Sequence, residues 1–124
     1  MMNLFPVVSI VDDDESVRES LPDLLKVFGF GSQTFSSAEE FLAKDGISGS
    51  KCLILDVAMP GMSGPELQRE LNRRKIEIPI IFISGNRDET LRSRQIQQGA
   101  IAFLIKPFSD AAMLEALNSA LQAK

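Results

Sequence analysis

The sequence predicts an α/β fold, a doubly wound five-stranded parallel sheet with five helices. Short apolar runs of strand composition alternate five times with segments of helical period along the 124 residues. Four of the five runs are continuously apolar, which is typical of strands that are covered on both faces. Units of this kind with right-handed crossovers produce a doubly wound sheet. No linker, repeat or low-complexity tract divides the chain, so we expect residues 1–124 to form a single domain.

The predicted strands lie at residues 6–11, 31–35, 51–55, 80–84 and 101–105. The run at 31–35 is the weaker candidate, and the other four are the continuously apolar ones. Ligands in doubly wound folds bind beyond the carboxyl ends of the strands. The residues that follow each run are therefore where functional chemistry is expected.

The first helical segment ends at Gly29, a residue that commonly terminates helices. Five apolar side chains before it follow the spacing of one helix face, so this face should pack on the sheet. These side chains are Val17, Leu21, Leu24, Leu25 and Phe28.

Serine caps predict the starts of the second and third helices. Ser37 can cap the second helix, with Glu40 at the capping-box position. Ser63 or Gly64 begins the third, with Pro65 in its first turn. The apolar residues expected on these two helices are Phe41, Leu42, Leu67 and Leu71.

The last two helices differ in polarity. The fourth, at about 88–98, is unusually polar, with Leu91 and Ile96 as its only large apolar residues. The fifth, at about 110–122, presents a regular apolar face. That face consists of Met113, Leu114, Leu117 and Leu121.

Composition and charge exclude several classes of function. The net charge is −4 and no stretch of Lys or Arg could neutralise several phosphates, so direct nucleic-acid binding is not expected. The chain has no His, which excludes His-based triads. Its single cysteine, Cys52, excludes an internal disulfide, and its place within an apolar run predicts a buried thiol. The apolar run at 7–11 is too short for a signal peptide or a membrane span, so we expect a cytoplasmic location and no membrane association.

Five chemically active side chains follow the predicted strands. Asp12 and Asp13 come after the first strand, Asp56 after the third, Ser84 ends the fourth and Lys106 follows the fifth. Each has an ordinary structural interpretation when taken alone, since acidic residues favour helix starts and Asp favours turns. Their joint placement at one edge of one sheet favours a functional site.

The chemistry of these groups favours phosphoryl transfer with a hard cation. Two carboxylates about 4 Å apart repel by about 4 kcal/mol at an effective dielectric constant of about 20, so three of them need a counter-charge. Oxygen ligands suit Mg²⁺, whose coordination shell leaves room for a phosphoryl oxygen. Asp56 is the candidate nucleophile, because carboxylates form aspartyl phosphates, and Lys106 would stabilise the charge.

Four motifs in order along the chain resemble those of the response-regulator receiver family. They are IVDDDE at 10–15, LILD at 53–56, MPGMSG at 59–64 and IKPF at 105–108. The resemblance covers nearly the whole chain, and the details VR at 17–18, SG at 84–85 and GA at 99–100 are most similar to receivers of the FixJ type. It implies a CheY-like fold related to the flavodoxins, with strand order 2-1-3-4-5.

The resemblance implies a magnesium site. In it, Asp13 and Asp56 ligate Mg²⁺ directly, Asp12 acts through water, and the backbone carbonyl of Ala58 is a further ligand. Many receivers carry a larger polar residue where this chain has Ala58.

The resemblance also implies the phosphoryl chemistry and the switch. Asp56 would accept a phosphoryl group from a histidine kinase, Lys106 would pair with Asp56 or the phosphoryl oxygens, and Ser84 would hydrogen-bond one of those oxygens. Phe103 occupies the position of the aromatic residue that changes rotamer together with Ser84. Ser84 stands where Thr is more frequent in the family, and Phe103 stands where Tyr is frequent. The peptide bond between Lys106 and Pro107 is expected to be cis.

Receivers of this kind are regulatory and catalyse only their own phosphorylation and dephosphorylation. FixJ-type receivers usually precede a helix-turn-helix output domain, and the end of this chain just after the fifth helix is compatible with a longer regulator. Phosphorylation would change the surface of the fourth helix, the fifth strand and the fifth helix, and would thereby control an output domain or support a homodimer.

Two other interpretations conflict with the residues present, and a third, the pseudo-receiver, remains the alternative. A haloacid-dehalogenase-like phosphatase needs a second Asp two residues after its nucleophile, where this chain has Ala58. A flavodoxin-like FMN site needs a Gly-, Ser- and Thr-rich loop after the first strand, where the acidic residues 12–15 would repel phosphate. A pseudo-receiver that binds partners without being phosphorylated usually lacks one of the acidic residues or the Lys, all of which are present.

Overall fold

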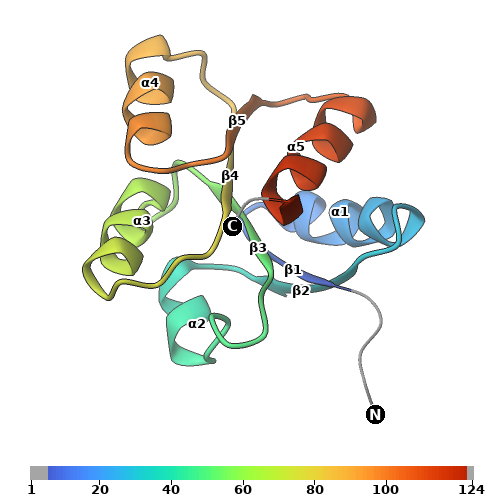
Figure 1. Ribbon diagram of the computed structural model, residues 1–124, viewed down its shortest axis with the longest axis horizontal. Coiled ribbons are helices and arrows are strands. Elements are labelled where there is room, and N and C mark those ends of the chain that lie inside the picture. The colour runs from blue at the N-terminus through green and yellow to red at the C-terminus, as the bar shows by residue number, and fades with distance from the viewer. Residues whose placement is uncertain (1–5, 123–124) are drawn as a thin grey trace.

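The computed structural model describes residues 6–122 and contains five strands and five helices that alternate along the chain (Figure 1). The strands are β1 (Val7–Val11), β2 (Gly31–Phe35), β3 (Cys52–Asp56), β4 (Ile80–Ser84) and β5 (Ala102–Ile105). The helices are α1 (Glu15–Val27), α2 (Ala38–Ala43), α3 (Gly64–Arg73), α4 (Glu89–Gln97) and α5 (Asp110–Gln122). All ten predicted elements are confirmed, with strand bounds shifted by at most one residue.

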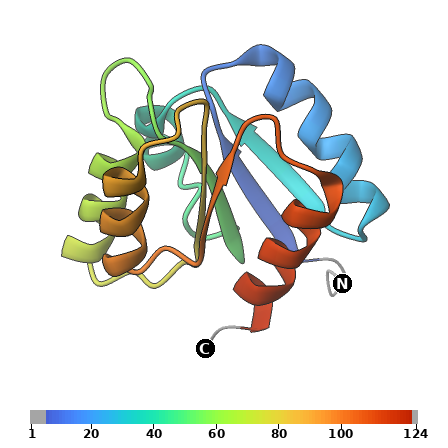
Figure 2. The same ribbon diagram turned by 90° about the horizontal axis from the view of Figure 1, so that it is seen from above.

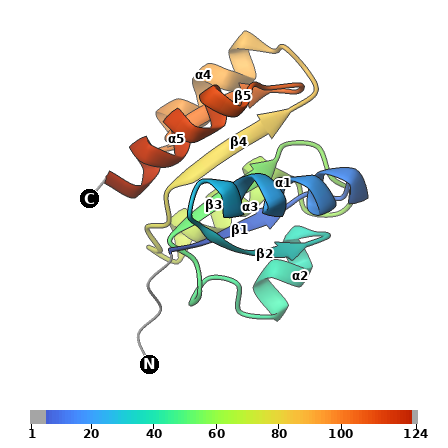
Figure 3. The same ribbon diagram turned by 90° about the vertical axis from the view of Figure 1, so that its right-hand side faces the viewer.

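The strands form one parallel sheet in the order β2-β1-β3-β4-β5, as expected. Their arrows point the same way in Figure 3, so their carboxyl ends meet at one edge. Val11 of β1 pairs with Leu55 of β3, and Ser84 of β4 pairs with Ile105 of β5. This register brings the residues that follow each strand to the same level.

Helices cover both faces of the sheet, which therefore separates two apolar cores (Figures 1 and 2). α1 and α5 pack on one face through Leu21, Leu25, Met113, Ala116, Leu117 and Ala120. α2, α3 and part of α4 cover the other through Ala38, Phe41, Leu67, Leu71 and Leu91. β3 and β4 lie between the two layers and are buried along their whole length, whereas the edge strand β2 alternates in burial. This difference explains why β2 carries the weaker sequence pattern.

The face that α4 turns toward the sheet differs from the prediction. Ile96 is 39% exposed, whereas Gln95 is 1% exposed and is the buried residue of the helix. Leu91 and Gln95 are four residues apart and therefore share one face, while Ile96 is rotated away from it. The expected pair of apolar anchors, Leu91 and Ile96, is wrong in its second member.

Two finer expectations about helices also change. Ser37 caps α2 as predicted, but the Glu40 carboxylate accepts a hydrogen bond from the Ser36 amide, not from that of Ser37. The complete capping box lies at α3, where Ser63 and Glu66 accept from each other's amides. On α5 the small residues Ala116 and Ala120 are buried together with Met113 and Leu117, while Leu114 and Leu121 are only half-buried.

Candidate functional site

Three carboxylates converge at the carboxyl edge of the sheet. Asp12 and Asp13 follow β1, Asp56 ends β3, and one oxygen from each of the three lies within 4.8 Å of the other two. β1 and β3 are neighbours, so the register alone places Asp12 beside Asp56. Asp12 is fully buried and Asp56 is 5% exposed, whereas Asp13 is exposed. The predicted acidic cluster therefore forms, with Asp13 at its outer rim.

Lys106 reaches the same cluster from β5. Its Nζ donates to Asp12 Oδ2 at 3.0 Å and to Asp56 Oδ1 at 3.4 Å. The Lys106 backbone amide donates to the Ser84 carbonyl at 2.7 Å, and the Lys106–Pro107 peptide bond is cis as expected. One ammonium group thus bridges the two buried carboxylates.

The electrostatics of the cluster show a deficit of positive charge. Burial, reinforced by the negative charge of Asp12, raises the pKa of Asp56 from 3.8 to about 7, although Lys106 acts in the opposite direction. Burial alone would lower the pKa of Lys106, but its hydrogen bonds and attraction to Asp12 and Asp56 outweigh that effect and raise it. A cation at this place would offset the repulsion that one lysine leaves uncompensated.

The donor set fits a hard divalent cation. The side chains offer only carboxylate oxygens, the ligands preferred by Mg²⁺, and the outer member Asp13 is accessible to solvent. Ala58 lies two residues after Asp56 in an exposed part of the β3–α3 loop. Asp12, Asp13 and Asp56 are therefore residues that could hold such an ion, and a part for the Ala58 carbonyl stays an implication of the resemblance.

The β3–α3 loop is held in place by two further contacts. A Cβ atom at Gly64 would collide with the Asp56 carbonyl oxygen, so glycine is needed for α3 to start this close to β3. Gly61 adopts a φ of +75°, and the next residue, Met62, donates its amide to Glu39 Oε2 at 2.8 Å. The glycines of the MPGMSG motif therefore shape the loop that lies over the cluster.

Ser84 and Phe103, the two residues that the resemblance implies in switching, lie at the end of β4 and within β5. Ser84 Oγ accepts from the Asn86 amide at 3.0 Å and is 3.2 Å from the Asn86 carbonyl oxygen. Phe103 is only 6% exposed and packs beside Phe82, with ring centroids 6.1 Å apart. The Phe103 side chain is therefore already turned inward in this structure, while Ser84 bonds the loop that follows β4.

Two residues outside the predicted site also contact the site loops. Arg18 Nη1 donates to the Asp12 carbonyl oxygen at 2.9 Å, and Glu39 binds the Met62 amide. Neither contact has a local sequence pattern, since each joins a helix to a loop through a single side chain. The position of Arg18 one turn into the helix that follows the acidic loop was the available hint.

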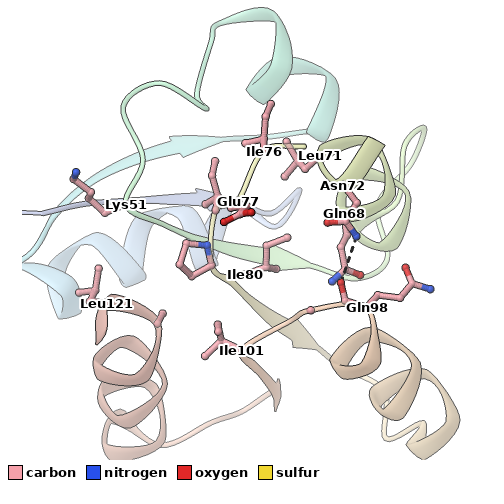
Figure 4. Close-up of a pocket in the computed structure, with 14 residues that line it drawn as sticks. Lys51, Gln68, Leu71, Asn72, Ile76, Glu77, Ile80, Gln98, Ile101 and Leu121 are labelled. Atoms are coloured by element: carbon pink, nitrogen blue, oxygen red, sulfur yellow. Dashed lines mark hydrogen bonds between the residues drawn. The ribbon is translucent and has the colours of Figure 1, made fainter. Parts of the chain in front are cut away.

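A groove on the surface lies away from the acidic cluster. It has a volume of about 570 Å³ and lies at the amino end of β4, between the ends of α3 and α5 (Figure 4). Gln68, Asn72 and Gln98 contribute amide groups to it, and Glu77 is the one carboxylate in its lining. This groove lacks the acidic cluster and is not the site of the chemistry.

No helix within residues 6–122 is long and apolar enough to cross a membrane.

The fold and the acidic cluster define a doubly wound domain with a candidate divalent-cation site at its strand ends. The model of the response regulator receiver domain matches residues 8–118. The response regulator protein TodT of Pseudomonas putida is 44% identical over 116 residues, which are 94% of this chain and 51% of TodT. The transcriptional regulatory protein FixJ of Rhizobium meliloti is 42% identical over 113 residues, 91% of this chain and 55% of FixJ.

A solved structure of the response regulator StyR has a TM-score of 0.87 and 46% sequence identity, and the match covers 95% of this chain and 60% of StyR. The chain belongs to the response regulator receiver domain family of two-component systems. It spans about half the length of the curated relatives that it matches.

Proposed function

We propose that this receiver domain is a phosphorylation-dependent switch in which Asp56 accepts a phosphoryl group from a histidine kinase. One observation carries the proposal, namely that the buried Asp56 carboxylate lies within one cluster with Asp12 and Asp13 and 3.4 Å from Lys106. A carboxylate at the carboxyl end of a strand lies at the edge where doubly wound folds bind their ligands, and its neighbours can compensate the charge that a phosphodonor brings.

In the proposed transfer, an Asp56 oxygen attacks phosphorus and forms the O–P bond of an aspartyl phosphate. The P–N bond to the kinase histidine breaks, and its electron pair stays on the departing imidazole. The Lys106 ammonium group moves from Asp56 toward the phosphoryl oxygens. The Ser84 hydroxyl gives up its hydrogen bonds with Asn86 and donates one to a phosphoryl oxygen. Hydrolysis of the aspartyl phosphate by water restores the Asp56 carboxylate.

We place a Mg²⁺ ion on Asp13, Asp56 and the Ala58 carbonyl, with Asp12 acting through water. The ion would neutralise the equatorial phosphoryl oxygens during transfer. The support for this assignment is the all-oxygen donor set, together with the raised pKa of Asp56, which reflects a need for positive charge.

The regulatory consequence is a changed surface of α4, β5 and α5, which would follow from the change of Ser84 contacts together with an adjustment of the already buried Phe103. Because FixJ is a transcriptional regulatory protein about twice as long as the matched segment, we propose that the surface controls a helix-turn-helix output domain or a phosphorylation-dependent homodimer. The domain would catalyse only its own phosphorylation and dephosphorylation.

The test is intact-mass spectrometry after treatment with acetyl phosphate, with and without Mg²⁺. The wild-type chain should gain one phosphoryl group only with Mg²⁺, and alkali should remove it. Asp56→Asn should gain none, whereas Asp23→Asn, an exposed carboxylate on α1, should behave as the wild type. Phosphorylation of Asp56→Asn would overturn the assignment, and no uptake by the wild type would identify a pseudo-receiver.

A further inference from the structure

We infer that Arg18 is a positioning residue for the metal site, because it holds the Asp12–Asp13 peptide in the geometry that directs Asp13 to the cation. The inference rests on the proposed function and adds to it a residue outside the cluster of ligands. It concerns the peptide between Asp12 and Asp13, whose carbonyl an ionised carboxylate cannot hold because it has no proton to donate.

The first step of the argument is the Asp12 carbonyl. β1 ends at Val11, and the Asp12 amide still donates to the Phe35 carbonyl of β2 at 3.2 Å. The Asp12 carbonyl has left the ladder, and Arg18 Nη1, at 2.9 Å, is the donor that the described residues supply to it. A carbonyl beside a fully buried side chain is costly to leave without a donor, so this contact fixes the orientation of the peptide that leads to Asp13.

The second step is that no backbone or basic donor fixes the Asp13 carboxylate. The Asp12 carboxylate is held by the Asp14 amide at 2.9 Å and by Lys106, and the Asp14 carboxylate is held by Ser16. Within residues 6–122, no amide, guanidinium or ammonium group donates to the Asp13 side chain; its partner is the protonated Asp56 carboxyl, and that bond is lost when Asp56 ionises to bind a cation. Its direction therefore depends on the backbone that precedes it, and Arg18 is the side chain that restrains this backbone.

The third step is that Arg18 is itself fixed at its base. Asp14 caps α1, and the Arg18 amide donates to the Asp14 carbonyl at 3.2 Å. Backbone and side chain of Arg18 together close a ring around the loop 12–14, which joins the end of β1 to the first turn of α1. A planar guanidinium with several donors in a rigid fork is suited to such a restraint.

A positioning role and a charge role have opposite consequences for cation binding. If Arg18 acted only through its positive charge, its removal would reduce repulsion and strengthen Mg²⁺ binding. If it positions Asp13, its removal should weaken binding, since loss of the groups that orient metal ligands typically reduces metal affinity by about 10- to 100-fold. The sign of the change therefore identifies the role.

The experiment is isothermal titration of the metal-free chain with Mg²⁺, with acetyl phosphate phosphorylation measured over a range of Mg²⁺ concentrations. Arg18→Ala should weaken Mg²⁺ binding by about tenfold and raise the Mg²⁺ concentration needed for half-maximal rate, with the maximal rate largely retained. Arg18→Lys keeps a charged donor and should recover part of the affinity. Lys26→Ala removes the same charge from the exposed end of α1 and should change neither quantity.

The outcomes separate the two proposals. A wild-type chain that neither binds Mg²⁺ nor becomes phosphorylated would reject the proposed function. A wild-type chain that does both, with Arg18→Ala equal to Lys26→Ala or tighter in Mg²⁺ binding, would reject the inference about Arg18 alone. Thermal unfolding of each variant shows whether it is folded. If Arg18→Ala is not folded, the decision passes to Arg18→Gln, which removes the charge and shortens the donor and should still bind Mg²⁺ more weakly than Lys26→Ala. Binding equal to or tighter than that of Lys26→Ala would reject the inference.

Discussion

Asp56 is held in a position that opposes its own ionisation. Its raised pKa means that the folded chain keeps the proton at pH values where the unfolded chain has lost it. Between pH 3.8 and about 7 the folded state therefore binds more protons than the unfolded state, and this group makes the stability fall as pH rises through that window. A site prepared for a cation and a phosphoryl group is thus destabilised in the absence of both.

Asp56→Asn should consequently stabilise the metal-free domain at neutral pH. At about pH 8 the variant should exceed the wild type in free energy of unfolding by about 1–3 kcal/mol, and at about pH 4 the difference should nearly vanish. Urea denaturation in a chelating buffer at the two pH values measures both. A difference that is independent of pH would contradict the role assigned to the charge of Asp56.

Cys52 offers a second prediction for a single residue. The thiol is fully buried in β3, and burial raises its pKa to about 12, so that it remains protonated near neutral pH. A thiol-specific reagent such as an aromatic disulfide should therefore react with the folded chain only as fast as it unfolds, and at once in concentrated urea. Rapid labelling without denaturant would mean that β3 opens locally.

Among the elements, α4 is held by the least apolar contact. Its buried residue, Gln95, receives a hydrogen bond on its backbone carbonyl from Gln68 Nε2 at 3.4 Å. The side-chain Oε1 atoms of Gln68 and Gln95 are buried and have no partner among the described residues. An interface that leaves two acceptors unpaired is weak, and such a helix is easily displaced.

Gln95→Leu should strengthen this interface, because it removes a buried acceptor and adds apolar contact. We expect the free energy of unfolding to rise by about 1 kcal/mol in urea denaturation, and hydrogen exchange along α4 to slow. Gln97→Leu is the matched control, since Gln97 is exposed on the same helix and its replacement should leave stability nearly unchanged. Destabilisation by Gln95→Leu would show that the amide makes a contact that α4 requires.

For the whole molecule, phosphorylation should act on the half of the sheet that carries β4, α4 and β5. Hydrogen exchange with beryllofluoride and Mg²⁺, a mimic of the aspartyl phosphate, should change mainly between Ser84 and Phe108. Phosphorylation needs to shift the free-energy difference between the two states by only a few kcal/mol. The exchange of Ser84 contacts and the weak packing of α4 make a shift of this size accessible. Changes confined to the surroundings of Asp13 and Asp56 would mean that the chain accepts the mimic without switching.

The sequence determined the architecture and the membership of the site by itself. Continuous apolar runs predicted β3 and β4 as strands buried on both faces, and a serine followed by Gly-Pro predicted the start of α3. Parallel strands bring their carboxyl ends to one edge, so the positions of Asp12, Asp56 and Lys106 in the chain already implied that they meet. These features follow from local periodicity and from a topology with few alternatives.

Only the tertiary structure decided the details that depend on rotation and on competing partners. Gln95 is buried in place of Ile96 because packing selects one rotation of α4 about its own axis. A short polar helix has no strong apolar periodicity that would specify this rotation from the sequence. Ser84 bonds Asn86, Phe103 is already inside, and Arg18 holds the Asp12 carbonyl. Each of these contacts is one of several that the same residue types could make, and the choice among them is made by the position of the neighbouring backbone.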